Sequence, residues 1–341
     1  MKQPILGVTM GDPAGVGPEI IARAAADPAV RRDSRPVVIG AASAMSAALA
    51  LVASPLTLHA VKHVADCRWA DGTLEALDLA NVDMATLPRG AVSAAAGRAA
   101  YDYVERAVAL AQAREIHGIV TAPINKEALA AAGMQHTGHT EILARLSNTA
   151  DFAMLLMGRE LRVIHVTTHV ALRRVPDLVT RERVLKTIRL AQRTMQGLGR
   201  SQARIAVAGL NPHAGEDGLF GDEEKTAIVP AIEAARAEGM TVIGPLPADT
   251  LFSRARGGEF DIVVAMYHDQ GHIPVKTVGF TYDDASKKWT GLSGVNVTVG
   301  LPFLRVSVDH GTAFDRAWKG IANPESIIEA IDVAVRMLAA T

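Results

Sequence analysis

Three histidines of this chain could form a metal site. His169, His213 and His268 each lie at or just beyond the end of an apolar run that is typical of a strand. In open α/β sheets, ligands bind beyond the carboxyl ends of strands, so side chains there face a crevice rather than the core. If the three neutral imidazoles converge, they could bind a divalent cation such as zinc and leave positions open for a substrate. The sequence does not show convergence, and the alternative is three unrelated strand-end histidines.

The stretch 266–276 holds further groups that could move a proton. It follows the apolar run 260–265 and contains Asp269 and Lys276 beside His268. Another carboxylate, Asp249, lies earlier in a Pro-Ala-Asp-Thr corner. Lys276, Asp249 and Asp269 are therefore the candidates for a catalytic proton acceptor, and only geometry can choose among them. The alternative is a polar loop and an ordinary turn aspartate.

Two cations and a helix start could bind an anion. Thr140 and Glu141 precede an apolar periodic run, which predicts a helix whose first N–H groups could hold an anion. Asn296 and Arg305 lie in strand-like settings, where an amide or a charge is unfavourable unless it faces solvent or a ligand. Arg305 and Lys276 could together hold a phosphate or a carboxylate. The alternatives are an ordinary helix cap and an Arg305 that pairs with a structural carboxylate.

The composition is that of a large, nearly neutral α/β protein. The 341 residues suggest about two domains, and 49% hydrophobic residues supply a large core. Lys plus Arg is 35 and Asp plus Glu is 36, which argues against nucleic acid as a partner. Cys67 is the single cysteine, so no internal disulfide is possible. We see no secretory signal and no apolar segment of membrane-spanning length, so the expectation is a cytoplasmic protein with no membrane partner.

Strand-like runs alternate with helix-period segments, which favours an α/β fold with a mostly parallel sheet. No linker marks a domain boundary, and His165, inside one of the runs, is predicted to be a core histidine. We expect one lobe from residues 1–130 plus 300–341 and a second from 131–299. The predicted strands are 5–9, 36–39, 118–121, 152–157, 161–167, 204–208 and 261–265, and the predicted helices are 95–114, 180–197, 223–239 and 324–340.

The glycines after the first strand do not form a dinucleotide fingerprint. The stretch 11–20 has Ile20 where G-x-G-x-x-G requires its third glycine, and no acidic partner follows at the usual distance. We interpret it as a tight turn, with Pro18 opening a helix and Glu19 in the first turn of that helix.

Taken together, seven stretches resemble the 4-hydroxythreonine-4-phosphate dehydrogenase (PdxA-type) family. They occur in the order of that family from end to end, so the resemblance covers essentially the whole chain. The matching stretches are Gly11-Asp-Pro-Ala-Gly-Val-Gly-Pro-Glu19, Thr137-Gly-His-Thr-Glu141, Thr168-His169, Gly209-Leu-Asn-Pro-His-Ala-Gly-Glu216, Gly244-Pro-Leu-Pro-Ala-Asp-Thr250, Met266-Tyr-His-Asp-Gln-Gly271 and Ser307-Val-Asp-His-Gly-Thr312.

The resemblance implies a two-lobed α/β fold like that of the isocitrate and isopropylmalate dehydrogenases, with the active site in the interlobe cleft of a homodimer. It implies NAD or NADP as the cofactor, and one divalent metal ion (Zn, Co, Mn or Mg) shared across the dimer interface. The family's metal ligands fall on His169, His213 and His268. Its substrate-binding positions fall on His139, Thr140, Lys276, Asn296 and Arg305. Asp309, Gly311 and Thr312 are candidates for lining the nicotinamide site, by analogy with the fold.

The implied reaction is metal- and NAD-dependent oxidation of the 3-hydroxyl of a 4-phosphorylated hydroxy acid, followed by decarboxylation. The segment 281–293 is longer than in the pyridoxine-pathway members and is predicted to be a hairpin with a charged tip. It is similar to the branch that acts on 4-phospho-D-threonate or 4-phospho-D-erythronate rather than on 4-phosphohydroxy-L-threonine. The motif 137–141 favours these phosphorylated substrates over a carboxylated cis-dihydrodiol.

Two other classes of protein compete with a dehydrogenase. A metal-dependent hydrolase or aldolase would use the same three histidines without a dinucleotide. A two-lobed solute-binding protein would close on a small anion, but its exported form needs a signal peptide that we do not find in the first residues.

Overall fold

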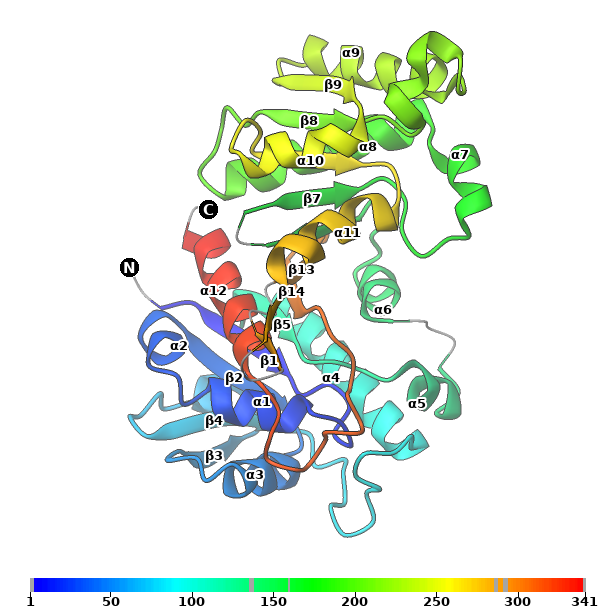
Figure 1. Ribbon diagram of the computed structural model, residues 1–341. Helices are drawn as coiled ribbons and strands as arrows, with labels where there is room; N and C mark the ends of the chain where they lie inside the picture. Colours follow the sequence, from blue (N-terminus) through cyan, green and yellow to red (C-terminus); the bar gives the residue numbers. More distant parts are fainter. Residues whose placement is uncertain (1–2, 135–137, 159, 285–287, 291–293, 340–341) are drawn as a thin grey trace. The chain divides into compact units, whose positions relative to one another are not determined.

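The computed structural model describes residues 3–134, 138–158, 160–284, 288–290 and 294–339 (Figure 1). The chain divides into a terminal unit, Met1–Ala150 with Leu301–Ala339, and a central unit that begins at Asp151 and ends at Gly300. The first boundary therefore follows Ala150 rather than residue 130, so the segment with His139 and Thr140 belongs to the terminal unit. None of the helices in the described part of the chain has the length and apolar character that crossing a membrane requires.

The terminal unit is built on a parallel sheet. Its six strands lie in the order β3-β4-β2-β1-β5-β14, and every neighbouring pair is parallel. The last strand returns from the far end of the sequence and pairs with β5, with Arg305 opposite Ile119. The strands are β1 (Ile5–Thr9), β2 (Arg35–Gly40), β3 (Thr57–Val61), β4 (Thr73–Asp78), β5 (Gly118–Thr121) and β14 (Leu304–Val308).

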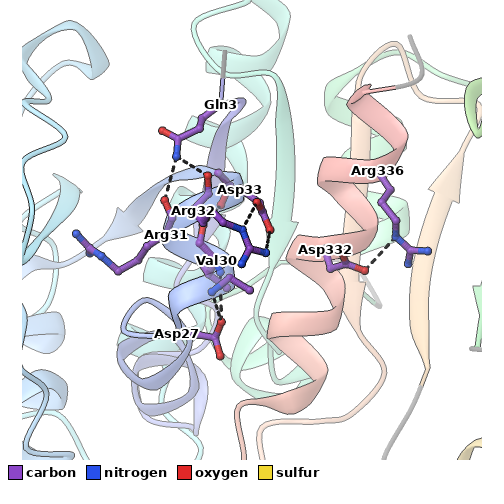
Figure 2. A network of polar contacts seen from close by, with 10 residues as sticks. Gln3, Asp27, Val30, Arg31, Arg32, Asp33, Asp332 and Arg336 are labelled. Carbon is purple, nitrogen blue, oxygen red and sulfur yellow. Dashed lines mark hydrogen bonds and ion pairs between the residues drawn. The ribbon is translucent and has the colours of Figure 1, made fainter. Parts of the chain in front are cut away.

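The helices of the terminal unit begin where the sequence supplies caps. Asp27 accepts hydrogen bonds from the N–H groups of Ala29 and Val30 at the start of α2, and Ser93 and Asn125 cap α4 and α5 in the same way. Figure 2 shows Asp27 at the start of α2, beside α12 with its Asp332–Arg336 pair. The helices are α1 (Gly17–Ala24), α2 (Pro28–Asp33), α3 (Ala42–Leu51), α4 (Ala94–Gln112), α5 (Lys126–Ala131), α6 (His139–Leu146) and α12 (Glu325–Ala339), with the 3₁₀ turn η1 (Val64–Asp66).

The central unit carries a mixed sheet. Its strands lie in the order β13-β6-β7-β10-β8-β9; β6 is antiparallel to both neighbours, and the other pairs are parallel. All residues of β6, β8 and β10 are buried, which explains their unbroken apolar sequences. The strands are β6 (Ala153–Met157), β7 (Arg162–His165), β8 (Ile205–Ala208), β9 (Val242–Leu246), β10 (Ile262–Ala265) and β13 (Val295–Val299).

The helices of the central unit include one that the sequence did not predict. The stretch after β10 is the helix α11 (His268–Gly279) and not a polar loop. The two-stranded hairpin of β11 (Thr281–Asp283) and β12 (Lys288–Thr290) confirms the predicted hairpin, whose tip at 285–287 and following segment 291–293 lie outside the described residues. The other elements are α7 (Val175–Leu178), α8 (Arg181–Gly197), α9 (Val229–Ala237), α10 (Ala248–Arg256), the 3₁₀ turns η2 (Leu172–Arg174) and η3 (Pro212–Gly218), and the π-helical turn η4 (Glu224–Ile228).

All seven predicted strands and the four predicted helices are present, with ends that shift by one or two residues, except that 223–239 divides into η4 and α9. The mostly parallel α/β fold is therefore confirmed. The strands β3, β4 and β9 were missed; β3 and β9 are edge strands, in which only Val61 and Val242 are buried. An edge strand without a buried face gives little periodic signal.

Candidate functional site

In the central unit, four histidines lie close together near the carboxyl ends of β7 and β10: His165, His169, His268 and His272. The rings of His169 and His268 have centroids 5.6 Å apart, and His268 lies 3.7 Å from His272 and 6.5 Å from His165. Two imidazoles that bind one zinc ion at about 2.0–2.1 Å have centroids on the order of 5 Å apart. The pair His169–His268 therefore fits two ligands of a metal ion.

His213 is not part of this group. Its nearest recorded ring neighbour is Phe220, with centroids 6.3 Å apart, and its side chain is exposed. Among the described residues, no group of three His, Cys, Asp or Glu side chains is close enough to hold a metal ion. Within the described part of one chain, the expected set of three histidines is thus incomplete.

The backbone around His213 explains its outward position. Residues 213–217 all have positive φ, from 43° to 84°, a left-handed conformation that is costly for residues other than glycine. The buried carboxylate of Glu224 holds the preceding turn, because it accepts hydrogen bonds from the N–H groups of Leu210 and Asn211 at 2.7 and 2.8 Å. Gly215 packs directly on this carboxylate, where a Cβ would lie 2.7 Å from Oε2. The motif 209–216 therefore places His213 by a structural network, which the sequence did not reveal.

His268 has one nitrogen that is committed to a carboxylate. Its Nδ1 lies 2.6 Å from Oδ1 of Asp269. If that nitrogen carries the proton, the lone pair of the neutral ring is at Nε2, the arrangement of the carboxylate–histidine–metal sites of many metalloproteins. Asp269 is thereby placed to orient His268, which weakens its candidacy as the catalytic base.

Behind His268, two buried histidines form a fixed pair. Nδ1 of His165 lies 3.1 Å from the carbonyl oxygen of Met154, which can only accept, so Nδ1 carries the proton. Nε2 of His165 must then accept from Nδ1 of His272, 3.2 Å away, and the same N–H also lies 3.1 Å from the carbonyl oxygen of His268. Burial, with the neighbouring His272, lowers the pKa of His165 to about 3. His165 is a neutral core histidine, as predicted.

Gln270 and Gly271 allow α11 to approach the sheet. The amide of Gln270 accepts from the N–H of Met266 at 2.7 Å and donates to the carbonyl oxygen of Gly209 at 2.8 Å, which ties the ends of β10 and β8 together. A Cβ on Gly271 would lie 2.3 Å from Nε2 of His165, so only glycine allows this packing. These two residues give the motif 266–271 its structural role.

The three candidate proton acceptors occupy two places in the central unit. Asp249, in the first turn of α10, and Asp269 both line a cavity of about 450 Å³ between α10 and α11, together with Tyr267. Lys276, in the last turn of α11, is not among the residues that line this cavity. Its Nζ lies 5.8 Å from the ring centroid of Phe280, which follows the helix. Asn296 is half-buried on β13, opposite Leu156 of β6.

In the terminal unit, Arg305 is a buried cation. Its side chain rises from β14, the residue is 2% exposed, and its Nη2 donates to the hydroxyl of Thr121 at 2.7 Å. Burial lowers the pKa of the Arg305 guanidinium to about 9, and the nearby Glu141 partly opposes that shift. A buried positive charge is unfavourable unless a partner or a ligand compensates it.

His139 lies close enough to Arg305 for the positive charge of Arg305 to lower the pKa of His139. Burial of the ring, and then the positive charge of Arg305, hold the pKa of His139 well below its usual range. Nε2 of His139 is buried and has no hydrogen-bond partner among the described residues. His139 and Thr140 begin the predicted helix, α6, and its N-cap Gly138 provides no side-chain cap. Thr137 of the same motif lies outside the described residues.

The glycine turn after β1 is filled by the chain itself. A Cβ on Gly11 would lie 2.3 Å from the carbonyl oxygen of Pro123, and one on Gly17 would lie 2.2 Å from that of Met10. The N–H groups of residues 12, 14, 15 and 16 all donate to oxygens of the protein. These four N–H groups are therefore not free to cradle a pyrophosphate as in a dinucleotide fingerprint. Pro18 and Glu19 open α1 as predicted.

The candidate nicotinamide residues lie beside this turn. The carbonyl oxygen of Thr312 accepts from the N–H of Val16 at 3.0 Å, and Thr312 contacts Gly15. Thr312 is buried, Gly311 is exposed and Asp309 is half-buried. Thr312 thus has a packing role that accounts for its position without a cofactor, while Asp309 and Gly311 remain predicted contacts.

Comparison with known proteins agrees with these motifs. The family model of the pyridoxal phosphate biosynthetic protein PdxA matches residues 32–334. The chain is 50% identical over 329 residues to a D-threonate 4-phosphate dehydrogenase of Cupriavidus necator, covering 96% of this chain and 95% of the relative. It is 44% identical over 334 residues to a 4-hydroxythreonine-4-phosphate dehydrogenase of Desulforapulum autotrophicum, covering 98% and 95%.

A solved structure shows the same fold. The crystal structure of 4-hydroxythreonine-4-phosphate dehydrogenase from Klebsiella pneumoniae superposes with a TM-score of 0.88 at 45% identity, covering 99% of this chain and 98% of that one. The predicted family is therefore confirmed, and this chain belongs to the PdxA family of dehydrogenases.

Proposed function

We propose that this protein oxidises the 3-hydroxyl of a 4-phosphorylated hydroxy acid with NAD or NADP and then releases CO₂ from the 3-keto product. The observation that carries this proposal is the buried guanidinium of Arg305, beside neutral His139 and the start of α6. The planar fork of a buried guanidinium suits the oxygens of a carboxylate or phosphate.

The substrate is proposed to be D-threonate 4-phosphate or its erythronate analogue rather than 4-phosphohydroxy-L-threonine. The relative that carries the D-threonate name is 50% identical, against 44% for the one that carries the hydroxythreonine name. The hairpin of β11 and β12 falls between Lys276 and Asn296, two proposed substrate ligands, and so could affect the choice of substrate.

A divalent metal ion (Zn, Co, Mn or Mg) is the second part of the proposal. His169 and His268 are its proposed ligands in one chain, with Nε2 as the donor atom of His268. When bound, the ion supplies Lewis acidity, which lowers the pKa of a substrate hydroxyl group. Asp269 would hold the His268 ring at Nδ1, and His272 would support the ring by stacking on one of its faces.

The remaining residues would bind and deprotonate the substrate. Asn296 and Lys276 would position it by hydrogen bonds and charge. Asp249 or Lys276 would accept the hydroxyl proton, since Asp269 already accepts from His268. NAD would take the hydride, with Asp309 and Gly311 among its proposed contacts.

We further propose a homodimer in which the second copy contributes the third metal ligand, His213. Six large apolar side chains are exposed in the described part of the central unit, with exposed fractions of 36–73%: Val170, Leu172, Leu178, Leu219, Phe220 and Ile273. Phe220 lies against His213, so an exposed apolar side chain borders that residue. Contiguous exposed apolar side chains mark protein interfaces, and the proposed dimer would cover these.

The test is a substrate panel with NAD or NADP and each metal ion in turn, with reduced cofactor as the readout. The panel contains 4-phospho-D-threonate, 4-phospho-D-erythronate, 4-phosphohydroxy-L-threonine and a carboxylated cis-dihydrodiol. We expect turnover with the first two and a requirement for metal. Release of inorganic phosphate or of an aldehyde without a dinucleotide would instead support a hydrolase or aldolase, and turnover of the dihydrodiol alone would overturn the phosphorylated substrate.

A further inference from the structure

A small polar cavity lies in the terminal unit, away from every residue proposed above to bind substrate, cofactor or metal. Its volume is about 140 Å³, and Arg35 and Thr73, the first residues of β2 and β4, line it. The cavity therefore lies at the amino ends of these strands, and β1 runs parallel to β2 in the same sheet. The glycine turn and residues 309–312, by contrast, follow the carboxyl ends of β1 and β14.

Two arginines of this cavity have no carboxylate partner among the described residues. Arg31, in the last turn of α2, and Arg35 are both half-buried and line the cavity. Neither of them forms an ion pair in the described part of the chain, whereas their neighbour Arg32 donates twice to Asp33, at 2.8 and 2.6 Å. The cavity thus brings two guanidinium groups together without a carboxylate in direct contact with either of them among the described residues.

Neutral groups hold both guanidinium groups in place. Nη1 of Arg31 donates to the carbonyl oxygen of Thr73 at 3.2 Å, and Nε of Arg35 donates to Oε1 of Gln3 at 3.2 Å. The guanidinium of Arg35 also lies over the ring of Trp69, 5.7 Å from its centroid. Gln3 is itself fixed, because its amide donates to the carbonyl oxygens of Arg31 and Arg32, as Figure 2 shows. Each arginine keeps terminal N–H groups for a ligand.

The acidic residues of the lining do not pair directly with these two arginines. Oε1 of Glu75 accepts from the N–H groups of Arg68 and Trp69 at 3.0 and 2.9 Å, and Oε2 lies 2.7 Å from Nδ1 of His59. Its carboxylate is therefore already occupied, and it fixes the backbone that carries Trp69. Asp71 is exposed at the rim of the cavity.

We propose that this cavity binds a small oxyanion of the phosphate class, distinct from the phosphate group of the substrate. Guanidinium forks match tetrahedral oxyanions, and two of them together favour a dianion over a monoanion. The volume equals that of a few water molecules at about 30 Å³ each, which suits an ion of the size of inorganic phosphate. It falls below the roughly 300 Å³ of pockets that bind larger ligands, so a small ion fills it better than a nucleotide would.

The experiment uses Trp69 as its own reporter. The full-length double variant Trp289→Phe/Trp318→Phe leaves Trp69 as the single tryptophan, and its fluorescence is measured while inorganic phosphate replaces chloride at constant ionic strength. We expect a saturable change with phosphate and a much weaker one with acetate. Arg31→Gln and Arg35→Gln, made in this background, should each weaken phosphate binding at least tenfold, and Asp71→Asn should tighten it.

Arg32→Gln is the matched control, because it removes the same charge one position along α2 from an exposed side chain that pairs with Asp33. Arg305→Gln separates this cavity from the proposed substrate site and should leave the Trp69 response intact. Thermal unfolding checks that each variant is folded. The proposal is overturned by the lack of a saturable response in the parent variant, by equal affinity in the Arg31, Arg32 and Arg35 variants, or by loss of the response in Arg305→Gln.

Discussion

His272 is stacked on His268, with ring centroids 3.7 Å apart and an angle of 10° between the ring planes. The two residues are one helical turn apart on α11, and the hydrogen bond from His272 to His165 fixes which nitrogen of His272 carries the proton. A proposed metal ligand is therefore held between Asp269 at its Nδ1 and a buried imidazole against its face.

The first prediction concerns this support. His272→Gln removes the stacked ring, and Asp269→Asn removes the carboxylate, so each should weaken binding of cobalt(II) by about 10- to 100-fold while the protein stays folded. The visible absorption of bound cobalt(II) measures the affinity without any need for turnover. Asp284→Asn, a change of the same type in another part of the central unit, is the control. Unchanged affinity in both variants would show that these residues do not orient His268.

The second prediction tests whether the metal site is shared between subunits. His213→Ala and His268→Ala should each be inactive alone, because each removes one ligand. When the two variants are mixed and allowed to exchange subunits, mixed dimers have one complete site and should regain up to about half of the activity per dimer. No recovery despite demonstrated subunit exchange would place all ligands in one chain, and activity of His213→Ala alone would remove His213 from the site.

The third prediction concerns Arg305. Arg305→Lys keeps a positive charge but loses the planar fork, so kcat/KM should fall by about 100-fold, or about 2.7 kcal/mol of transition-state stabilisation. Steady-state kinetics over a range of substrate concentrations measure the loss. Arg316→Lys, an exposed arginine of the same unit, should behave like the parent. Equal kinetics in the two variants would contradict a substrate role for Arg305.

The fourth prediction concerns Asp12, a fully buried carboxyl group whose Oδ2 has no hydrogen-bond partner in the described part of the chain. Burial raises its pKa from 3.8 to about 6, although a hydrogen bond from the Ala14 N–H opposes the shift. The folded state then binds more protons than the unfolded state between these values, so this group lowers stability as pH rises from about 4 to 6.

Asp12→Asn removes this titration. The free energy of unfolding of the variant, relative to the parent, should therefore rise over the same pH range and level off above pH 6, by up to about 3 kcal/mol. Urea unfolding at a series of pH values gives the difference directly, and the comparison cancels the titration of all other groups. A difference that does not depend on pH would show that Asp12 keeps an ordinary pKa.

The fifth prediction concerns the glycine turn. Gly17→Ala would place a Cβ 2.2 Å from the carbonyl oxygen of Met10, which is far inside van der Waals contact. This clash should destabilise the protein by about 2 kcal/mol or more. Gly197→Ala is the control, because a Cβ added there would have no heavy atom within 4 Å. Gly133 also has open space, but its positive φ would strain an alanine. Chemical unfolding measures both. A turn that served only to hold a dinucleotide would instead lose cofactor affinity and keep its stability.

The sequence alone determined the class of fold and the type of most elements. Short, mainly apolar runs such as 118–121 and 261–265 predicted buried strands, and their alternation with amphipathic segments favoured a mostly parallel sheet. The motifs determined the family, because their residue types and order are local properties of the chain.

Only the tertiary structure decided which side chains meet. His165 and His272 lie 107 positions apart, and their contact depends on the missing Cβ of Gly271, which no periodic pattern encodes. Likewise, Asp269 could be distinguished from Asp249 only by its distance to His268. Periodicity indicates which face of an element is buried, whereas hydrogen bonds and ring contacts depend on packing between distant segments. The residues of the proposed site could therefore be listed from the sequence, but their contacts could not be predicted.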